Sequence, residues 1–267
     1  MLSDITLGQF FPGKSPVHKL DARVKLILTI AYIVALFLVS NYFGYLVIVG
    51  LIGLVLVLSK IPFSMLLKSL KPLIFIIAFT AVLNLFYGAG EHVLFEYGFL
   101  RITEEGIRNA IMMSLRIIFL IAGTSLLTYT TSPIMLTDAI ERLLSPLKKI
   151  HLPVHELAMM MTIALRFIPT LVEETGKIMS AQKARGADFE SGSLVSRVKA
   201  LVPILVPLFV SAFRRADELA TAMECRCYHG GENRTRMKQL TIAGRDFAAC
   251  GVFALCIALI ALCNVYL

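Results

Sequence analysis

Apolar runs long enough to cross a lipid bilayer recur along this chain. A transmembrane helix needs about 20 mostly apolar residues, because it rises about 1.5 Å per residue through a hydrocarbon core of about 30 Å. Five runs approach that length, at residues 24–40, 42–58, 73–87, 107–129 and 247–267. The third run is short unless it also uses residues 65–70. The pattern predicts an all-α, polytopic membrane protein with about five transmembrane helices.

Residues 131–245 show a different pattern, in which polar and apolar positions alternate at helical spacing. Segment 134–147 places its charged residues on one helical face and its leucines on the other. A second helix is expected over 156–185, bent near Pro169, and the polar residues of 211–218 mark the wet face of a third. These patterns predict long amphipathic helices that lie in the membrane interface or pack as a bundle beneath it.

The charges between the apolar runs alternate in sign. Lys60, Lys68 and Lys71 lie in one loop that has no acid, whereas loop 88–106 carries four glutamates opposed only by Arg101. This is the positive-inside pattern, and it predicts a cytoplasmic N-terminus. The net charge of +8 is therefore distributed over several loops. Such a distribution argues against a nucleic-acid partner and for the lipid bilayer as the surroundings of the protein.

One further apolar run, at residues 194–213, is not expected to cross the membrane. It contains Pro203 and Pro207, and a sixth crossing there would break the charge pattern. The chain is therefore expected to have three parts. They are an N-terminal membrane domain of four transmembrane helices at 1–130, a cytoplasmic coupling-helix domain at 131–245, and a C-terminal transmembrane helix at 246–267.

The composition supports an integral membrane protein. Hydrophobic residues make up 57% of the chain and charged residues only 16%, with a mean hydropathy of +0.79. Soluble domains average about 45–50% apolar residues. The five cysteines are an odd count, and three of them lie in the last apolar run, so no disulfide framework is expected.

Two short segments in the C-terminal half resemble each other. Ala184-Arg185-Gly186 and Cys225-Arg226-Cys227 each hold an arginine between two small residues at the end of a helical pattern. Arginine also favours helix C-termini for dipole reasons, but that preference explains the duplication and the small neighbours poorly. Small neighbours expose a guanidinium, whose planar fork suits carboxylates or carbonyl oxygens of a partner. We interpret the pair as docking sites for two similar partners.

The order of charges around the repeat is also regular. An acidic pair, Glu173-Glu174, precedes Arg185, and a basic pair, Arg214-Arg215, precedes Arg226. In both copies the second residue of the pair lies eleven residues before the arginine. Shape is therefore duplicated while charge is not. Two related but non-identical partners would fit that arrangement.

Three other patterns are weaker. Residues 8–15 match the form G-x-x-x-x-G-K-S of a phosphate-binding loop, but too little chain precedes Gly8 to form the required strand, and Pro16 follows directly. His151, His155 and Glu156 suggest a metal-binding helix, yet Pro153 interrupts it. The set of Cys225, Cys227 and His229 lacks the fourth ligand of a structural zinc site. We therefore expect no cofactor, no bound metal and no catalytic residue.

Two polar residues fall inside the apolar runs, where polar groups are costly. Arg116 lies in the fourth run and Asn84 in the third. A structural role within the bundle and a role in transport both remain open for them. The apolar runs hold no acid that would suggest an ion-coupled carrier.

Several motifs are similar to those of a known family. Three stretches resemble the transmembrane T component (EcfT) of energy-coupling factor vitamin importers. They are residues 7–13 followed by His18-Lys19-Leu20-Asp21-Ala22-Arg23, the stretch 136–149, and Ala164-Leu165-Arg166-Phe167-Ile168-Pro169-Thr170-Leu171 running on to 181–188. The resemblance covers essentially the whole chain. One departure is that the second arginine motif of the family usually has Ala and Gly where this chain has Cys225 and Cys227.

The resemblance implies a non-catalytic transmembrane subunit in the plasma membrane of a prokaryote. It implies that the coupling helices dock two related ABC ATPases through Ala184, Arg185, Gly186, Cys225, Arg226 and Cys227. It further implies that apolar faces of these helices hold a small membrane-embedded substrate-binding (S) subunit, which reorients as ATP is hydrolysed. The substrate is not specified by the sequence.

Three alternatives to this function stay open. The nearest is a T component dedicated to a metal-ion (cobalt or nickel) importer. A self-contained membrane metalloenzyme would need His151, His155 or the set of Cys225, Cys227 and His229, and an autonomous carrier would transport without added ATPases.

Overall fold

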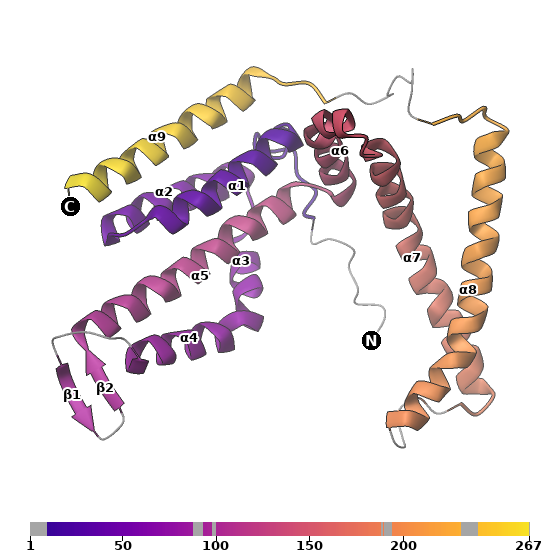
Figure 1. Cartoon of the computed structure of the whole chain (residues 1–267), viewed down its shortest axis with the longest axis horizontal. Helices are drawn as coiled ribbons and strands as arrows, with labels where there is room; N and C mark the ends of the chain where they lie inside the picture. The colour runs from indigo at the N-terminus through magenta and orange to yellow at the C-terminus, as the bar shows by residue number, and fades with distance from the viewer. Residues whose placement is uncertain are drawn as a thin grey trace. The chain divides into compact units, whose positions relative to one another are not determined.

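The computed structural model describes residues 10–87, 93–97, 100–187, 189, 194–230 and 240–266. Its elements, in chain order, are α1 (Ala22–Leu38), α2 (Tyr42–Ser59), α3 (Phe63–Leu70), the 3-10 turn η2 (Lys71–Leu73), α4 (Ile74–Tyr87), β1 (Val93–Tyr97), β2 (Leu100–Thr103), α5 (Glu104–Thr130), α6 (Pro133–Leu144), the 3-10 helix η3 (Ser145–Ile150), α7 (Val154–Ala184), α8 (Leu194–Glu224) and α9 (Gly244–Tyr266) (Figure 1).

The predicted all-α membrane class is confirmed. Within the described residues, five stretches are long and apolar enough to cross a membrane: Tyr42–Ser59, Phe63–Phe86, Glu104–Thr130, Val154–Ala184 and Gly244–Tyr266. Four of these coincide with predicted runs, and the third run does extend into α3. The fifth predicted run ends at residue 267, which lies outside the described residues.

Two details of the span assignment differ from the prediction. The first predicted run forms α1, but α1 is not among the five stretches. Its 17 residues are at the lower limit for a spanning helix, which usually has about 17–25 residues. Helix α7, expected as an amphipathic coupling helix, is also apolar and long enough to span. Helix α8, which contains the run 194–213, is not among the five stretches.

A small antiparallel hairpin connects α4 to α5, within the segment that the sequence predicts to be an acidic loop. Strands β1 and β2 pair with Glu96 opposite Arg101 and Tyr97 opposite Leu100. Helix α5 then begins within the same predicted loop, because Thr103 caps it: the Thr103 side chain accepts a hydrogen bond from the Gly106 N–H at 3.0 Å.

The chain folds as two compact units. We call the first the membrane unit; it contains the described residues of 8–139 and 239–267. The second, which we call the long-helix unit, contains the described residues of 140–238 and is dominated by α7 and α8. The three-part division proposed from the sequence stays a prediction.

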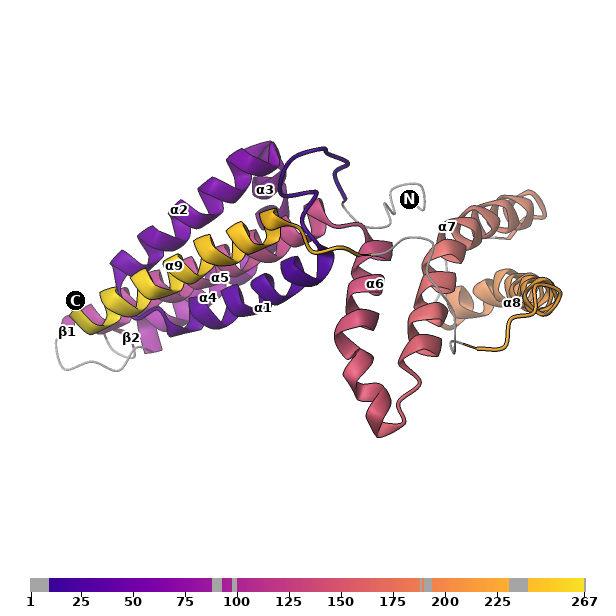
Figure 2. The same cartoon turned by 90° about the horizontal axis from the view of Figure 1, so that it is seen from above.

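In the membrane unit, α5 is the central helix. It packs against α1, α2, α3 and α4, while α9 packs against α1 and α2 (Figure 2). Leu36, Val39 and Ile48 are among the most buried side chains of the resulting core. A close approach of α1 to α5 depends on Gly123, because a Cβ there would lie 2.2 Å from the Tyr32 ring.

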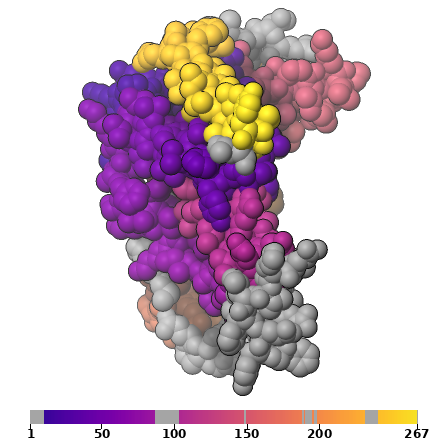
Figure 3. Space-filling model, turned by 90° about the vertical axis from the view of Figure 1, so that its left-hand side faces the viewer, coloured from indigo at the N-terminus to yellow at the C-terminus, as the bar shows by residue number. Residues whose placement is uncertain are grey.

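The C-terminal helix α9 is attached to the N-terminal part of the membrane unit at both of its ends. At its start, the Asp246 carboxylate accepts hydrogen bonds from the backbone N–H groups of Asp21 (2.8 Å) and Ala243 (2.7 Å). Near its end, Asn264 accepts from Ser40 N–H (3.3 Å) and donates to the Leu38 carbonyl (2.6 Å). The space-filling view shows α9, in yellow, lying against this part of the chain (Figure 3).

Candidate functional site

The two repeated arginine motifs both form the C-terminal caps of long helices. Arg185 directly follows α7, and Arg226 comes two residues after the end of α8. Each helix has 31 residues, which corresponds to a length of about 46 Å at the standard rise. The docking residues expected from the sequence therefore lie at the tips of the two longest helices that the structure describes.

The two caps share one hydrogen-bond pattern. In the first, Ala187 N–H donates to the Gln182 carbonyl and Gly186 N–H to that of Lys183, both at 3.0 Å. In the second, Tyr228 N–H donates to Met223 (3.0 Å) and Cys227 N–H to Glu224 (2.8 Å). This is the Schellman arrangement, which satisfies the last carbonyl groups of a helix.

The Schellman arrangement needs a left-handed residue directly after each arginine. Gly186 adopts it with φ of +87°, and Cys227 adopts it with φ of +54°. Glycine reaches this conformation without a steric penalty, whereas a residue with a Cβ is strained in it. The duplication seen in the sequence therefore extends to the backbone, and Cys227 occupies a position that favours glycine.

All six expected docking residues are exposed. They are Ala184, Arg185, Gly186, Cys225, Arg226 and Cys227. No hydrogen bond or ion pair joins either arginine side chain to another described residue. Within the part of the chain that the structure describes, both guanidinium groups are therefore open to a partner.

The second cap borders a recess of about 400 Å³, whose walls include Met159 and Ile163 from α7, Met223 from α8, and the Tyr228 and His229 that follow Cys227. Arg226 and Cys227 themselves belong to this wall.

Helices α7 and α8 pack antiparallel through their polar residues (Figure 1). The Glu174 carboxylate accepts a short hydrogen bond from the Ser211 hydroxyl and a second bond, of 3.1 Å, from Arg215 Nη2. Further along, Gln182 Nε2 donates to the Pro203 carbonyl at 3.4 Å. The sequence had placed Glu174, Ser211 and Arg215 on wet faces; the structure places those faces against each other.

The opposite face of α8 is apolar and exposed. Its large exposed side chains include Val202, Val206, Phe209, Val210 and Phe213, with exposed fractions from 51% to 69%. A water-soluble helix pair would bury such a row, because an exposed apolar patch of this extent marks a surface for a membrane or another protein. The α7–α8 pair therefore has its polar face inside and an apolar face outside.

The antiparallel packing sets the separation of the two arginines. Arg185 lies eleven residues beyond Glu174 on α7, and Arg226 lies eleven residues beyond Arg215 on α8, in the opposite direction. At about 1.5 Å per residue, the two caps are on the order of 30 Å apart. This separation would allow each cap to contact a different partner.

The candidate metal ligands are not gathered into a site. Among the described residues, no group of three or more His, Cys, Asp or Glu side chains could hold a metal ion. His155 Nδ1 instead lies 3.0 Å from Glu141 Oε1, which ties α7 to the end of α6. His151 lies in the turn before Pro153, with a positive φ of 60°.

The segment that matches a phosphate-binding loop folds around a histidine. Gly8 and Gln9 lie outside the described residues; from there on, Ser15 Oγ lies 2.7 Å from His18 Nδ1, and His18 Nε2 lies 2.9 Å from the Phe11 carbonyl oxygen. The His18 ring fills the space beside Gly13 that a phosphate would need, since a Cβ on Gly13 would come within 2.8 Å of it. Burial lowers the pKa of His18 below its usual value.

The two polar residues in the apolar runs have local partners. Arg116 Nη2 donates to the Val39 carbonyl at the end of α1 (3.2 Å), and its guanidinium carbon lies 5.5 Å from the centre of the Phe37 ring. Asn84 Nδ2 donates to the Thr80 carbonyl within α4 (2.8 Å). Arg116 thus binds one of the carbonyl groups that a helix end leaves unpaired.

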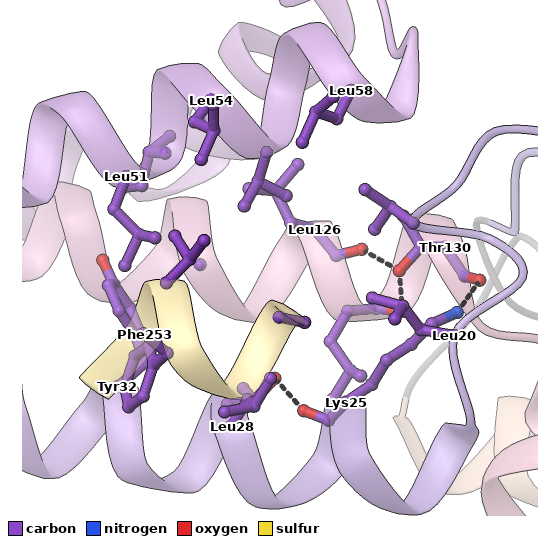
Figure 4. Close-up of a pocket in the computed structure, with 18 of the residues that line it drawn as sticks. Leu20, Lys25, Leu28, Tyr32, Leu51, Leu54, Leu58, Leu126, Thr130 and Phe253 are labelled. Carbon is purple, nitrogen blue, oxygen red and sulfur yellow. Dashed lines mark hydrogen bonds between the residues drawn. The ribbon is translucent and has the colours of Figure 1, made fainter. Parts of the chain in front are cut away.

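A cavity of about 350 Å³ lies among α1, α2, α5 and α9 of the membrane unit (Figure 4). Apolar side chains, among them Leu28, Leu51 and Leu126, form most of its wall, and Lys25 lies at one end. The Lys25 ammonium already donates to the carbonyl oxygens of His18 (3.2 Å) and Thr130 (2.9 Å). Arg245 is the second charged residue that the structure describes in the wall, and the rest of the wall is mostly apolar, so few groups there could orient a polar substrate.

Comparisons with known proteins agree with one another. A family model described as "Cobalt transport protein" (CbiQ) matches residues 13–237. The energy-coupling factor transporter transmembrane protein EcfT of Clostridium kluyveri is 56% identical over 263 residues, which cover 97% of both chains. The protein of the same name from Bacillus subtilis is 51% identical over 247 residues, covering 92% of this chain and 93% of its own.

Proposed function

We propose a function from one premise: the chain belongs to the family of energy-coupling factor transporter transmembrane proteins, EcfT, within the wider cobalt transport protein family. It is accordingly a membrane protein and a transmembrane component of an energy-coupling factor transporter. Its relatives are named as transporter components, which are generally non-catalytic. The proposal concerns how this chain couples energy to transport.

In our proposal, Arg185 and Arg226 each dock one of two related cytosolic ABC ATPases. The observation that carries it is the pair of exposed arginines on caps with one backbone geometry, at opposite ends of an antiparallel helix pair. Ala184, Gly186, Cys225 and Cys227 are the small neighbours that let a partner approach each guanidinium. The different small neighbours of the two arginines, Ala and Gly in one cap and two cysteines in the other, support partners that are similar but not identical.

The α7–α8 pair then transmits movement between the ATPases and the membrane. When ATP binding or hydrolysis moves the ATPases, the two caps move with them, and the contacts of Glu174 with Ser211 and Arg215 couple the helices at their common polar face. The exposed apolar row of α8 is where a membrane-embedded vitamin-binding subunit would rest, since burial of this row in water-free surroundings is favourable. Reorientation of that subunit would release the vitamin.

The proposal also fixes a location and orientation. The protein would be a multi-pass component of the plasma membrane of a prokaryote with its N-terminus in the cytoplasm. The lysines of loop 60–71 and the arginine caps would share the cytoplasmic side, as the positive-inside pattern requires.

A second candidate is a T component dedicated to a cobalt or nickel importer, which the description of the matching family favours. The relatives with 51–56% identity over more than 90% of the chain carry the general energy-coupling factor name and favour the first proposal. Identification of the binding subunit that co-purifies with the chain distinguishes the two, because a vitamin-binding and a metal-binding subunit differ in mass and ligand.

The test is transport in proteoliposomes that contain the full chain, both ATPases and the binding subunit. The double substitution Arg185→Glu with Arg226→Glu should abolish ATP-driven uptake, because it reverses the charge at both docking sites at once. Lys177→Glu with Arg214→Glu is a matched control, since it reverses one exposed positive charge on each of α7 and α8, eight and twelve residues before the respective docking arginines. Full uptake by the first variant would contradict the proposal.

A further inference from the structure

Two lysines of the membrane unit take no part in the docking of ATPases proposed above. Lys68 lies in the last turn of α3, and Lys71 is the first residue of η2. Both are exposed, and no hydrogen bond or ion pair joins either ammonium group to another described residue. At a spacing of three residues they lie on one side of the helical turn. The loop that contains them, residues 60–71, has no acid.

The two lysines border an apolar groove in the same unit. The groove has a volume of about 670 Å³ and is formed by α3, η2 and α4, with one residue from α5. Leu67, Ile74, Ile77 and Ala81 belong to its wall, and the two lysines are the only charged residues among the described ones that line it. The groove thus combines an apolar channel along α4 with two positive charges at the α3 end.

The position of the groove restricts what could fill it. It is part of the stretch Phe63–Phe86, which is long and apolar enough to cross a membrane. Neighbouring side chains of α4 point outward as well, with Ile74 58% and Phe75 78% exposed. A ligand in this place must be apolar along α4 and negatively charged beside Lys68 and Lys71.

We propose that this groove binds one anionic phospholipid of the leaflet on the lysine side. The phosphate pairs with the Lys68 and Lys71 ammonium groups, and an acyl chain lies along Ile74, Ile77 and Ala81. Basic pockets between membrane helices hold anionic headgroups by this combination of charge and apolar contact. The proposal does not depend on the docking of ATPases.

Native mass spectrometry of the full chain in detergent, titrated with phosphatidylglycerol, tests the proposal. The variant Lys68→Gln with Lys71→Gln should bind the first phosphatidylglycerol more weakly by on the order of 25-fold, at about a tenfold change per 1.4 kcal/mol and about 1 kcal/mol for each lysine. Phosphatidylcholine, which has no net charge, should bind the wild type no better than this variant. Inorganic phosphate should not compete, because it lacks the acyl chain.

Two further variants separate the groove from general surface charge. Lys19→Gln with Lys60→Gln removes two exposed positive charges of the same unit that do not line the groove, and it should leave the first binding step within about threefold of wild type, a difference of less than 1 kcal/mol. Ala78→Phe narrows the groove while keeping both lysines, and it should weaken binding as well. Equal losses in the two lysine variants, or unchanged binding in Ala78→Phe, would overturn the proposal.

Discussion

Glu174 and Arg215 form an ion pair of 3.1 Å between α7 and α8, although they occupy equivalent positions in the two copies of the repeat. Each lies eleven residues before the docking arginine of its own helix. The sequence shows that the two copies carry opposite charges at this position, and the ion pair gives a structural reason for that difference. The opposite charges allow two similar helices to pair with each other at equivalent positions, and they leave the two caps at opposite ends.

The first prediction concerns this pair. Glu174→Arg places two positive charges opposite each other and should reduce ATP-driven uptake, because α7 and α8 no longer move together. Adding Arg215→Glu restores opposite charges and should recover most of the uptake. Glu173→Arg, a change of the exposed neighbour, serves as the control for charge alone. The account fails on this point if the double variant is no better than the single one.

The second prediction concerns the residue after each arginine. Gly186→Ala should destabilise the cap of α7 by about 1–2 kcal/mol, since a Cβ is unfavourable at φ of +87°. Cys227→Gly should stabilise the cap of α8 by a similar or smaller amount, because it removes such a Cβ at φ of +54°. Hydrogen exchange at the amides of Ala187 and Tyr228 reports on the two caps, and the two substitutions should shift it in opposite directions.

The third prediction concerns the attachment of α9. Asp246 is only 2% exposed, and its carboxylate is the acceptor for two backbone N–H groups. Asp246→Ala leaves both donors without that acceptor and should lower stability by about 1–3 kcal/mol for each. Asn264→Ala removes bonds of an exposed side chain and should cost less. Thermal unfolding of the purified protein in detergent measures both losses, and equal losses would count against the assigned role of Asp246.

The fourth prediction is a pH dependence that comes from His18. Burial lowers its pKa in the folded protein below the value of about 6.5 expected for the unfolded chain. The unfolded state then binds the proton more readily, so the contribution of neutral His18 to stability is complete above about pH 6.5. It is lost as the pH falls from there towards the lower folded-state pKa.

The measurement compares wild type with His18→Gln. The wild-type melting temperature should fall more steeply than that of the variant as the pH is lowered through the region below about 6.5. Parallel curves for the two proteins would mean that another group causes the pH dependence.

The sequence was sufficient for features that depend on local pattern. Four of the five predicted runs coincide with apolar helices because a spanning segment must satisfy its own backbone hydrogen bonds, so length and hydropathy are enough to find it. The helix end at Gly186 could also be predicted, because a glycine directly after a helical pattern favours a C-terminal cap. The strained Cys227 could have been inferred by aligning it with Gly186 in the repeat.

Other features depend on contacts that no local pattern contains. The sequence pattern identifies the polar faces of α7 and α8. It does not show whether water or another helix contacts those faces, and the prediction of wet faces was therefore wrong where the two helices pack together. The pairing of Glu174 with Arg215 requires the antiparallel register of the two helices. The hydrogen bond from Asp21 to Asp246 joins residues 225 positions apart, and nothing in either neighbourhood predicts it.

The most direct test of the central claim counts the ATPases that stay with the chain after purification. The single variants Arg185→Glu and Arg226→Glu should each weaken retention of one of the two ATPases, and the double variant should retain neither, while all three remain folded in the membrane fraction. Retention of both ATPases by the double variant would contradict the account.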